Sequence, residues 1–265
     1  MPRRRRSALI LTALDVETKA VLRHLKRNGE KVVGGTVFYL GKFEDWDVAV
    51  AECGTGNTGA AAIAQRGIAS FEPRVALFVG VAGGIKDVKT IDVVVADKMY
   101  TYESGKEDAG GVRPRPNVRN CAHEIEQRGR ALPKSNDWRK RLDPDLSHDN
   151  PDVKVGPVAT GEKVVATAEG QTADFLRQTY GDALAVEMEG GGFLEAVDIN
   201  SLVSGGVVRG ISDLLSGKTE ADQGGSQKLA ADAASAAAFE ILHGLVPTTR
   251  TKSKGGKKSP PTALK

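Results

Sequence analysis

Short, nearly uninterrupted apolar runs alternate with segments of helical pattern along most of this chain. In runs such as 75–79 (VALFV) and 93–96 (VVVA) every residue is apolar, which is typical of strands buried on both faces of a sheet. We expect strands at about 7–13, 36–41, 46–52, 74–81, 91–97, 155–160, 183–187 and 205–211, and helices at about 15–28, 57–70, 168–180, 188–199 and 226–245. This alternation predicts one α/β domain with a mainly parallel, mixed central sheet flanked by helices.

The length and the cysteine content narrow the class of protein. A chain of 265 residues with 40% hydrophobic residues can bury one large core. Its two cysteines, Cys53 and Cys121, form neither a disulfide framework nor a metal-binding spacing, which favours a reducing, cytoplasmic setting. No stretch approaches the ~20 apolar residues that a membrane span requires, so we expect no membrane association.

Positive charge is concentrated at the two ends of the chain. Four arginines lie at 3–6, and the tail 248–265 holds one arginine and five lysines without an acid, so the net charge of +3 becomes −7 once these ten charges are set aside. An acidic body argues against a nucleic-acid surface. We expect a basic disordered N-terminus at 1–6, one folded domain at 7–247 and a basic disordered tail at 248–265.

The segment 103–150 differs from the rest of the domain. It has almost no strand signal, contains several prolines, and has nine Lys or Arg against three acids between Gly111 and Leu142. A short helix is expected near 121–131. Long irregular connections inside a domain are often functional, so this basic insertion is either a solvated surface excursion or a lid that faces phosphate.

A G-x-G-x-x-G sequence at 54–59 follows a predicted strand and opens a predicted helix. A dinucleotide site would also require an acid at the end of the next strand, to bind the ribose hydroxyls. That strand ends in 79–84 (VGVAGG), which contains no acid. The glycines are therefore expected to allow close packing against a ligand or a neighbouring strand, rather than to bind NAD.

Carboxylates follow three of the apolar runs. Glu17 comes just after the first strand, Glu187 and Glu189 flank Met188 at the end of another, and Asp213 ends a third. A single acid in such a position is usually a helix N-cap. Three sites at one edge of a parallel sheet, where ligands bind in such folds, instead predict a pocket of carboxylates.

The motifs that carry these acids resemble the nucleoside phosphorylase superfamily, and especially its methylthioadenosine/S-adenosylhomocysteine nucleosidases. Corresponding blocks occur in the family's order at 13–21, 54–62, 79–97, 156–165 and 185–213. The pair V-E-M-E (186–189) and R-G-I-S-D (209–213) is the most specific of these signals. The resemblance implies a nucleoside phosphorylase-like fold, a homo-oligomer, a small purine nucleoside or nucleotide as partner, and no metal or organic cofactor.

The resemblance also implies residue roles. Glu17 matches the acid that deprotonates the attacking water, and Asp213 matches the acid that protonates N7 of the leaving purine. Arg209 and Ser212 match positions that orient the water and Asp213. The ribose would lie against Glu187, Met188 and Glu189, and the purine against Gly83, Val164 and Val165. Because cleavage at C1′ passes through an oxocarbenium-like state, both an activated water and a neutralised leaving group are required.

Two departures from the family pattern bear on the reaction. Phosphorylases of this superfamily seat phosphate with an Arg and a Ser, where this chain has Phe78 and Val81. A phosphate ion would be buried there without a partner, so hydrolysis is favoured over phosphorolysis. Val164 stands where the family places an aromatic residue against adenine.

The substrate is left open between two classes. The basic insertion and Lys163 resemble the phosphorylase-like effector domains of bacterial immune proteins, some of which remove adenine from adenine nucleotides. Arginine and lysine suit phosphate, and the candidates here are Lys106, Arg113, Arg115, Arg119 and Lys163. The first hypothesis is an adenine nucleotide hydrolase of ATP or AMP type, a defence effector. The alternatives are a methylthioadenosine/S-adenosylhomocysteine nucleosidase, a phosphorolytic enzyme, and a non-catalytic nucleotide-binding module.

Overall fold

The computed structural model describes residues 6–108, 111–146, 150–165, 170–215 and 223–245. The expected basic ends therefore lie outside the described residues, except for Arg6. The strands are β1 (Ser7–Thr12), β2 (Lys26–Val33), β3 (Thr36–Phe43), β4 (Trp46–Glu52), β5 (Val75–Gly84), β6 (Val93–Thr101), β7 (Gly105–Asp108), β8 (Gly111–Pro114), β9 (Asn117–Asn120), β10 (Val153–Thr160), β11 (Ala185–Glu187) and β12 (Ser204–Leu214). The helices are α1 (Asp15–Leu22), α2 (Asn57–Phe71), α3 (His123–Ala131), α4 (Gln171–Thr179), α5 (Gly190–Ile199) and α6 (Gln223–Gly244), with 3-10 turns η1 (Leu132–Lys134) and η2 (Asp137–Arg141).

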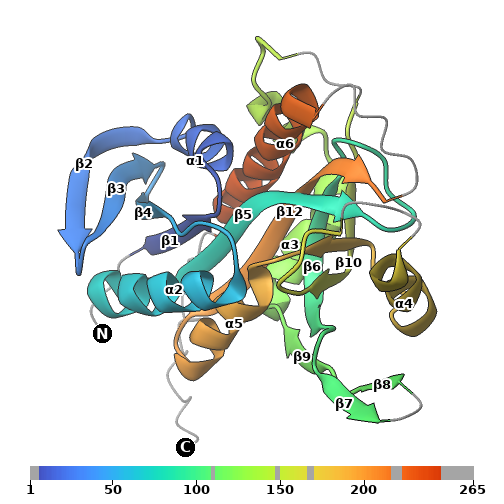
Figure 1. Ribbon diagram of the computed structural model, residues 1–265. Coiled ribbons are helices and arrows are strands. Elements are labelled where there is room, and N and C mark those ends of the chain that lie inside the picture. Colours follow the sequence, from blue (N-terminus) through green and yellow to red (C-terminus); the bar gives the residue numbers. More distant parts are fainter. Residues whose placement is uncertain (1–5, 109–110, 147–149, 166–169, 216–222, 246–265) are drawn as a thin grey trace, which may run out of the picture.

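The central sheet has the strand order β11-β10-β6-β12-β5-β1-β4-β3-β2, and β9 pairs with β6. The pairs β1–β4, β1–β5, β5–β12, β6–β10 and β10–β11 are parallel, whereas the outer β2–β3–β4 meander is antiparallel. Strand β11 also pairs with β5 in the antiparallel sense, so part of the sheet closes on itself. The carboxyl ends of β1, β5, β11 and β12 consequently meet in one region (Figure 1).

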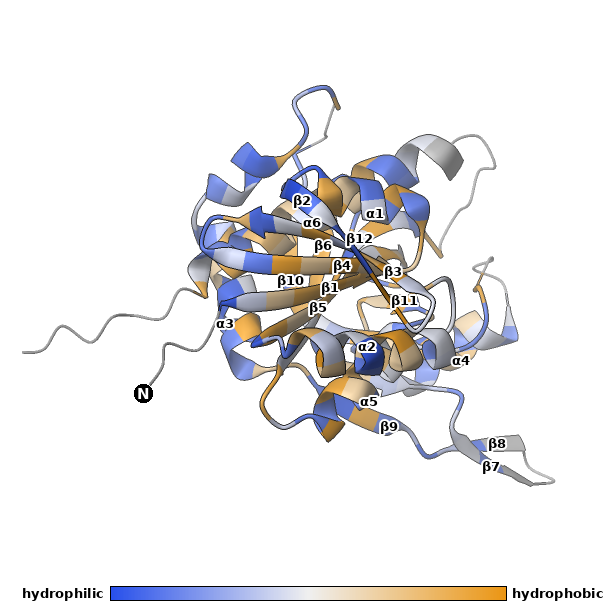
Figure 2. Cartoon of the chain, turned by 90° about the vertical axis from the view of Figure 1, so that its left-hand side faces the viewer, coloured by the Kyte–Doolittle hydropathy of each residue, from blue (hydrophilic) through white to orange (hydrophobic). Residues whose placement is uncertain are grey.

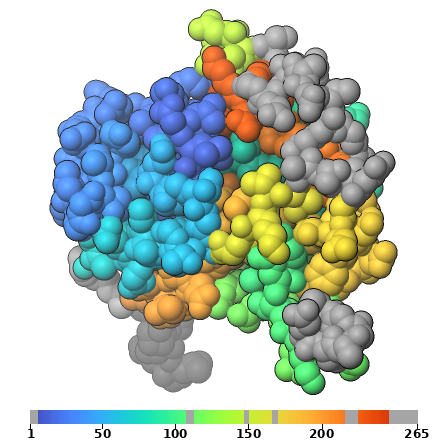
Figure 3. Space-filling view, in the orientation of Figure 1, coloured from blue at the N-terminus to red at the C-terminus, as the bar shows by residue number. Residues whose placement is uncertain are grey.

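Helices cover both faces of this sheet (Figure 1). One buried cluster joins α1 and α6 to the strands and includes Trp46, Trp138 and Phe239, and a second joins α2 and α5 to the opposite face and includes Phe78 and Phe193. Apolar residues accordingly gather along the strands and the inner sides of the helices (Figure 2). On the surface, the N-terminal third of the chain lies beside the segment around residues 160–190 (Figure 3).

The predicted fold class, an α/β domain with a mixed sheet flanked by helices, is confirmed. The predicted helix 15–28 is wrong in its second half, because α1 ends at Leu22 and residues 26–33 form the edge strand β2. This strand is almost entirely exposed, so it lacks the alternating apolar pattern by which strands are recognised. Backbone pairing with β3 determines its structure instead.

The basic insertion is more ordered than its sequence indicated. Strands β7 and β8 form a two-stranded sheet of their own, and β9 adds to the main sheet. The expected helix near 121–131 is present as α3. Four-residue strands with many polar residues carry little periodic signal, so the expectation of an almost strandless segment is wrong.

Close backbone packing at β12 gives the first testable prediction. A Cβ on Gly210 would overlap the carbonyl group of Ala230 in α6, where neither backbone can move freely. Gly210→Ala is therefore expected to lower the free energy of unfolding by about 2–4 kcal/mol, the upper range for overpacking. Urea denaturation measures this change.

Gly83→Ala on the neighbouring strand β5 is the matched control. A Cβ there would lie 3.7–3.9 Å from its nearest atoms, an ordinary van der Waals distance. Its stability is expected to stay within about 1 kcal/mol of the wild type. Equal stabilities for the two variants would contradict the packing of α6 against β12.

Candidate active site

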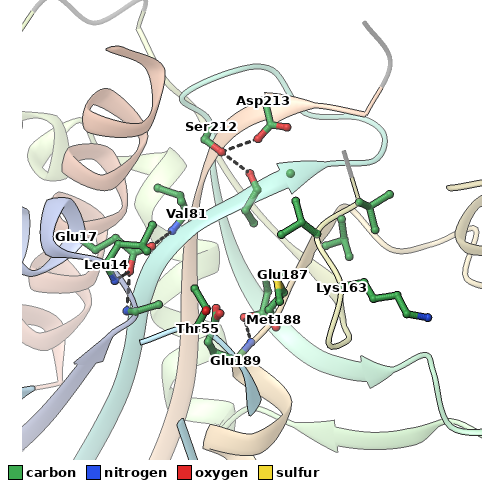
Figure 4. Close-up of a pocket in the computed structure, with 16 residues that line it drawn as sticks. Leu14, Glu17, Thr55, Val81, Lys163, Glu187, Met188, Glu189, Ser212 and Asp213 are labelled. Carbon is green, nitrogen blue, oxygen red and sulfur yellow. Dashed lines mark hydrogen bonds between the residues drawn. The ribbon is translucent and has the colours of Figure 1, made fainter. Parts of the chain in front are cut away.

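A pocket lies where the carboxyl ends of β1, β5, β11 and β12 meet (Figure 4). Its walls come from six separate parts of the chain. The lining residues are Ala13, Leu14, Glu17, Thr55, Val81, Ala82, Gly83, Lys163, Val164, Val165, Val186, Glu187, Met188, Glu189, Ser212 and Asp213. Every acid predicted from the sequence lines it, as do the predicted purine-contacting residues Gly83, Val164 and Val165.

Glu17 lies in the first turn of α1, and backbone N–H groups hold both of its carboxylate oxygens. Ala13 N and Leu14 N donate to Oε2 at 2.7 and 3.0 Å, and Val81 N donates to Oε1 at 2.8 Å. Burial raises the pKa of this carboxyl, although Arg209 and the three N–H donors lower it in part. The carboxyl therefore binds a proton more readily than an exposed glutamate, as a base for water must.

Arg209 is fully buried beneath the pocket, on the central strand β12. Its Nη2 donates to the carboxylates of Glu187 and Glu189, and its Nη1 donates to Val81 O at 3.3 Å. Burial alone would lower the pKa of this guanidinium, but the carboxylates of Glu187, Glu189 and Glu17 raise it above its usual value. Its charge also lies over the Phe78 ring, 4.4 Å from the ring centroid.

Glu187 and Glu189 differ in what their oxygens contact. Glu187 accepts hydrogen bonds from the backbone N–H groups of Glu189 and Gly190, at the start of α5, in addition to its ion pair with Arg209. Glu189 accepts from Gly56 N at 3.2 Å and from Arg209 at 3.0 Å. Burial raises the pKa of Glu189 to about 7, with Arg209 opposing this shift and Glu187 adding to it. Both oxygens of Glu187 thus accept hydrogen bonds from the backbone at the start of α5. Each oxygen of Glu189 has one such contact, which leaves it better able to bind a ligand.

Asp213 and Ser212 lie near the carboxyl end of β12, across the pocket from Glu189 (Figure 4). Ser212 Oγ lies 2.7 Å from Asp213 Oδ1 and 3.4 Å from Ala82 O. A hydroxyl can donate to an ionised carboxylate or accept from a protonated one while donating to the carbonyl. Ser212 can therefore hold Asp213 in one orientation both before and after proton transfer.

Only one of the five cations predicted to bind phosphate lines this pocket. Lys163 lies at its edge, but its side chain extends away from the carboxylates (Figure 4) and its Nζ is 3.4 Å from Glu103 Oε1. Arg119 forms ion pairs with Glu195 and Asp198 of α5. Lys106 and Arg113 lie on the β7–β8 hairpin, and Arg115 follows it. These four side chains do not line the pocket of this chain, because the hairpin projects from the body of the domain (Figure 1) and Arg119 is held at α5 by its ion pairs.

The lining of the pocket is rich in carboxylates, and Arg209 is the buried counter-charge beneath it. Such a site can bind hydroxyl groups, activate a water molecule and protonate a basic ring nitrogen. Within the described ranges, no three His, Cys, Asp or Glu side chains are arranged to hold a metal ion. No helix in the described part of the chain is long and apolar enough to cross a membrane.

Comparison with known proteins agrees with this architecture. The family model of the phosphorylase superfamily matches residues 7–247. A 5′-methylthioadenosine/S-adenosylhomocysteine nucleosidase from Staphylococcus epidermidis is 23% identical over 211 residues, which are 80% of this chain and 88% of that protein. This chain belongs to the phosphorylase superfamily, so the membership predicted from the V-E-M-E and R-G-I-S-D motifs is confirmed.

Solved structures share the fold at low sequence identity. An S-adenosylhomocysteine nucleosidase from Streptococcus pyogenes, in complex with 5-methylthiotubericidin, has a TM-score of 0.75 at 20% identity and covers 93% of this chain and 100% of its own. Futalosine hydrolase of Helicobacter pylori has a TM-score of 0.71 at 21% identity and covers 91% of this chain and 99% of its own.

Several contributors to the pocket were not identified as functional from the sequence. Backbone N–H groups of Ala13, Leu14 and Val81 donate to Glu17, and Gly56 N donates to Glu189. No side-chain pattern in the sequence signals such donors. The G-x-G-x-x-G motif did point to close packing at this loop. Gly54 and Gly56 have φ angles of 73° and 105°, values that side chains disfavour, and this backbone path carries Gly56 N to Glu189.

The raised pKa of Glu189 predicts how stability depends on pH. Between about pH 4.5 and 7 the unfolded chain has this carboxyl ionised while the folded protein keeps it protonated, so stability falls as pH rises through this window. Glu189→Gln has no such proton. We expect its free energy of unfolding to decline less over this window than that of the wild type, by on the order of 1–3 kcal/mol.

Urea denaturation at pH 5, 6, 7 and 8 measures these slopes. Glu195→Gln, on the exposed side of α5, is the control and should follow the wild type. Parallel curves for the wild type and Glu189→Gln would contradict the protonated, buried state of this carboxyl.

Proposed function

We propose that this chain is a purine N-ribosyl hydrolase, which releases adenine from a ribosyl compound by attack of water at C1′. The observation that carries the proposal is the convergence of Glu17, Glu189 and Asp213 on one pocket. Glu17 accepts the proton of the attacking water, Glu189 binds the ribose hydroxyls, and Asp213 protonates the leaving purine. The purine lies against Gly83, Val164 and Val165. Arg209 keeps the carboxylates in place.

Phe78 and Val81 support water rather than phosphate as the nucleophile. The Phe78 ring is fully buried, lies beneath the Arg209 guanidinium and packs edge-on against Phe193 at 5.6 Å. A phosphorolytic enzyme of the superfamily would have a cationic side chain there. Val81 presents an apolar side chain to the pocket, and its N–H already donates to Glu17. Inorganic phosphate would therefore be desolvated without a compensating partner.

The carboxylates also bear on the 5′-group of the substrate. Four acids line the pocket, whereas Lys163 is the only Lys or Arg of its described lining. Polyphosphates would be repelled by such a lining, so we propose a 5′-thio-substituted adenosine of the methylthioadenosine or S-adenosylhomocysteine type as substrate. The adenine nucleotide is the second candidate, and the position of Lys163 at the edge of the pocket favours it. In a homo-oligomer, the hairpin cations of one copy could reach the pocket of another copy. Such an arrangement would strengthen this second candidate.

Catalysis by the two acids can be tested directly. Asp213→Asn and Glu17→Gln are each expected to lower kcat by about 10²-fold or more, the usual effect of losing a general acid or base. Asp198→Asn, on the surface of α5, is the matched control and should keep the wild-type rate. Release of free adenine is measured by chromatography, and retention of near wild-type rates in both acid variants would contradict the assignment.

Product analysis tests the nucleophile and the substrate class together. The ribosyl product is expected to be a free reducing sugar, in the same yield with and without inorganic phosphate. Methylthioadenosine and S-adenosylhomocysteine should give a higher kcat/KM than AMP or ATP. A ribose 1-phosphate product would refute hydrolysis. A preference for AMP or ATP, lost in Lys163→Met, would establish the nucleotide candidate instead.

A further inference from the structure

Asn57 joins three segments that form separate walls of the pocket. It is the first residue of α2 and follows the loop 54–56, whose Thr55 lines the pocket. Its Nδ2 donates to Gly161 O at 3.0 Å, and its Oδ1 accepts from Thr160 Oγ1 at 3.1 Å and from Gly192 N at 2.8 Å. These partners belong to the end of β10 and to the first turn of α5.

The two partner segments continue directly to opposite sides of the proposed substrate. Gly161 begins the loop that carries Val164 and Val165, the purine side. Gly192 lies three residues after Glu189, the ribose side, and Gly56 N itself donates to Glu189 Oε1 at 3.2 Å. One carboxamide is therefore hydrogen-bonded to the segment that carries the purine wall and to the segment that carries the ribose-binding carboxylate.

The surrounding backbone is shaped to permit this contact. A Cβ on Gly192 would overlap the backbone of Asn57, and a Cβ on Gly191 would approach Thr160 Cγ2 at 2.6 Å and Asn57 Oδ1 at 3.2 Å. The start of α5 can thus approach Asn57 only because glycine occupies both positions. Three directional hydrogen bonds to rigid backbone and to a buried threonine fix the carboxamide more tightly than general packing would.

We propose that Asn57 is a positioning residue, which sets the distance between the purine wall and the ribose-binding carboxylate. This inference rests on the proposed function. Asn57 contacts no substrate itself in this arrangement, since it is absent from the lining of the pocket. Its loss should therefore appear first in substrate binding rather than in the chemical step.

Asn57→Asp removes the hydrogen bond to Gly161 O and keeps those from Gly192 N and Thr160 Oγ1. The introduced carboxylate can still accept from Gly192 N and Thr160 Oγ1, but it repels Gly161 O instead of donating to it. We expect KM for the best substrate and Kd for adenine to rise at least about 10-fold, a typical effect of an unmet buried polar contact. The kcat value should change by less than about 3-fold, because Glu17, Arg209 and Asp213 keep their partners.

The pH dependence distinguishes positioning from a general loss of structure. Once protonated, the introduced carboxyl can donate to Gly161 O, so the ratio of variant to wild-type KM should fall towards one between pH 8 and pH 5. Asn200→Asp, at the far end of α5, makes the same substitution at a carboxamide that donates to Gln65 and Ala196 O. It should leave KM unchanged at every pH.

The outcomes separate this inference from the proposed function. Wild-type protein that releases no purine from any compound of the panel refutes the proposed function. Wild-type turnover combined with unchanged KM and adenine affinity in Asn57→Asp refutes the positioning role alone. If this variant does not fold, Asn57→Ala cuts all three bonds without adding charge, and the same rise in KM and Kd is required of it at every pH.

Discussion

The buried guanidinium of Arg209 is the interaction on which the rest of the site depends. It is completely removed from solvent and shares its charge among carboxylates of the pocket floor, two of them in direct contact. Without such a cation the ionised forms of three carboxyl groups could not be buried together, because the pKa of each would rise further. Removing the arginine would leave uncompensated negative charge, so it holds together both the site and the strand ends that form it.

The closed part of the sheet explains how acids from distant parts of the sequence reach this cation. Strands β5 and β12 pair in parallel over most of their length, and β11 joins β5 at its carboxyl end. Glu187 and Asp213 then lie in the last residues of strands that end at one place. Glu17 and Glu189 follow shortly after β1 and β11. Gly80 completes the arrangement, because a Cβ there would contact Glu17 Oε1 at 2.5 Å and would overlap Arg209. The geometry of the pocket is thus a consequence of backbone pairing as much as of side-chain choice.

Part of the basic insertion is held against the body of the domain by ion pairs. Arg141 in η2 pairs with Glu240 of α6, and Asp143 lies 3.7 Å from Arg23, which also pairs with the buried Asp232. These contacts fix the insertion to α6 and to the end of α1, the helix that carries Glu17. The positive charges of the insertion therefore do not gather at the pocket of this chain. Its charges are distributed between ion pairs on the body and the projecting hairpin.

The sequence by itself determined the fold class, the positions of the main strands along the chain and the acids of the pocket. Apolar runs reveal buried strands, and an acid directly after such a run must lie near the carboxyl end of its strand. The tertiary structure alone decided the exposed strand β2, the hairpin β7–β8, and the backbone N–H groups that hold Glu17 and Glu189. These features depend on main-chain pairing, which leaves no periodic side-chain pattern. The hydrogen bonds of Asn57, on which its proposed role rests, likewise emerged only in three dimensions, because its partners lie more than one hundred residues away in the sequence.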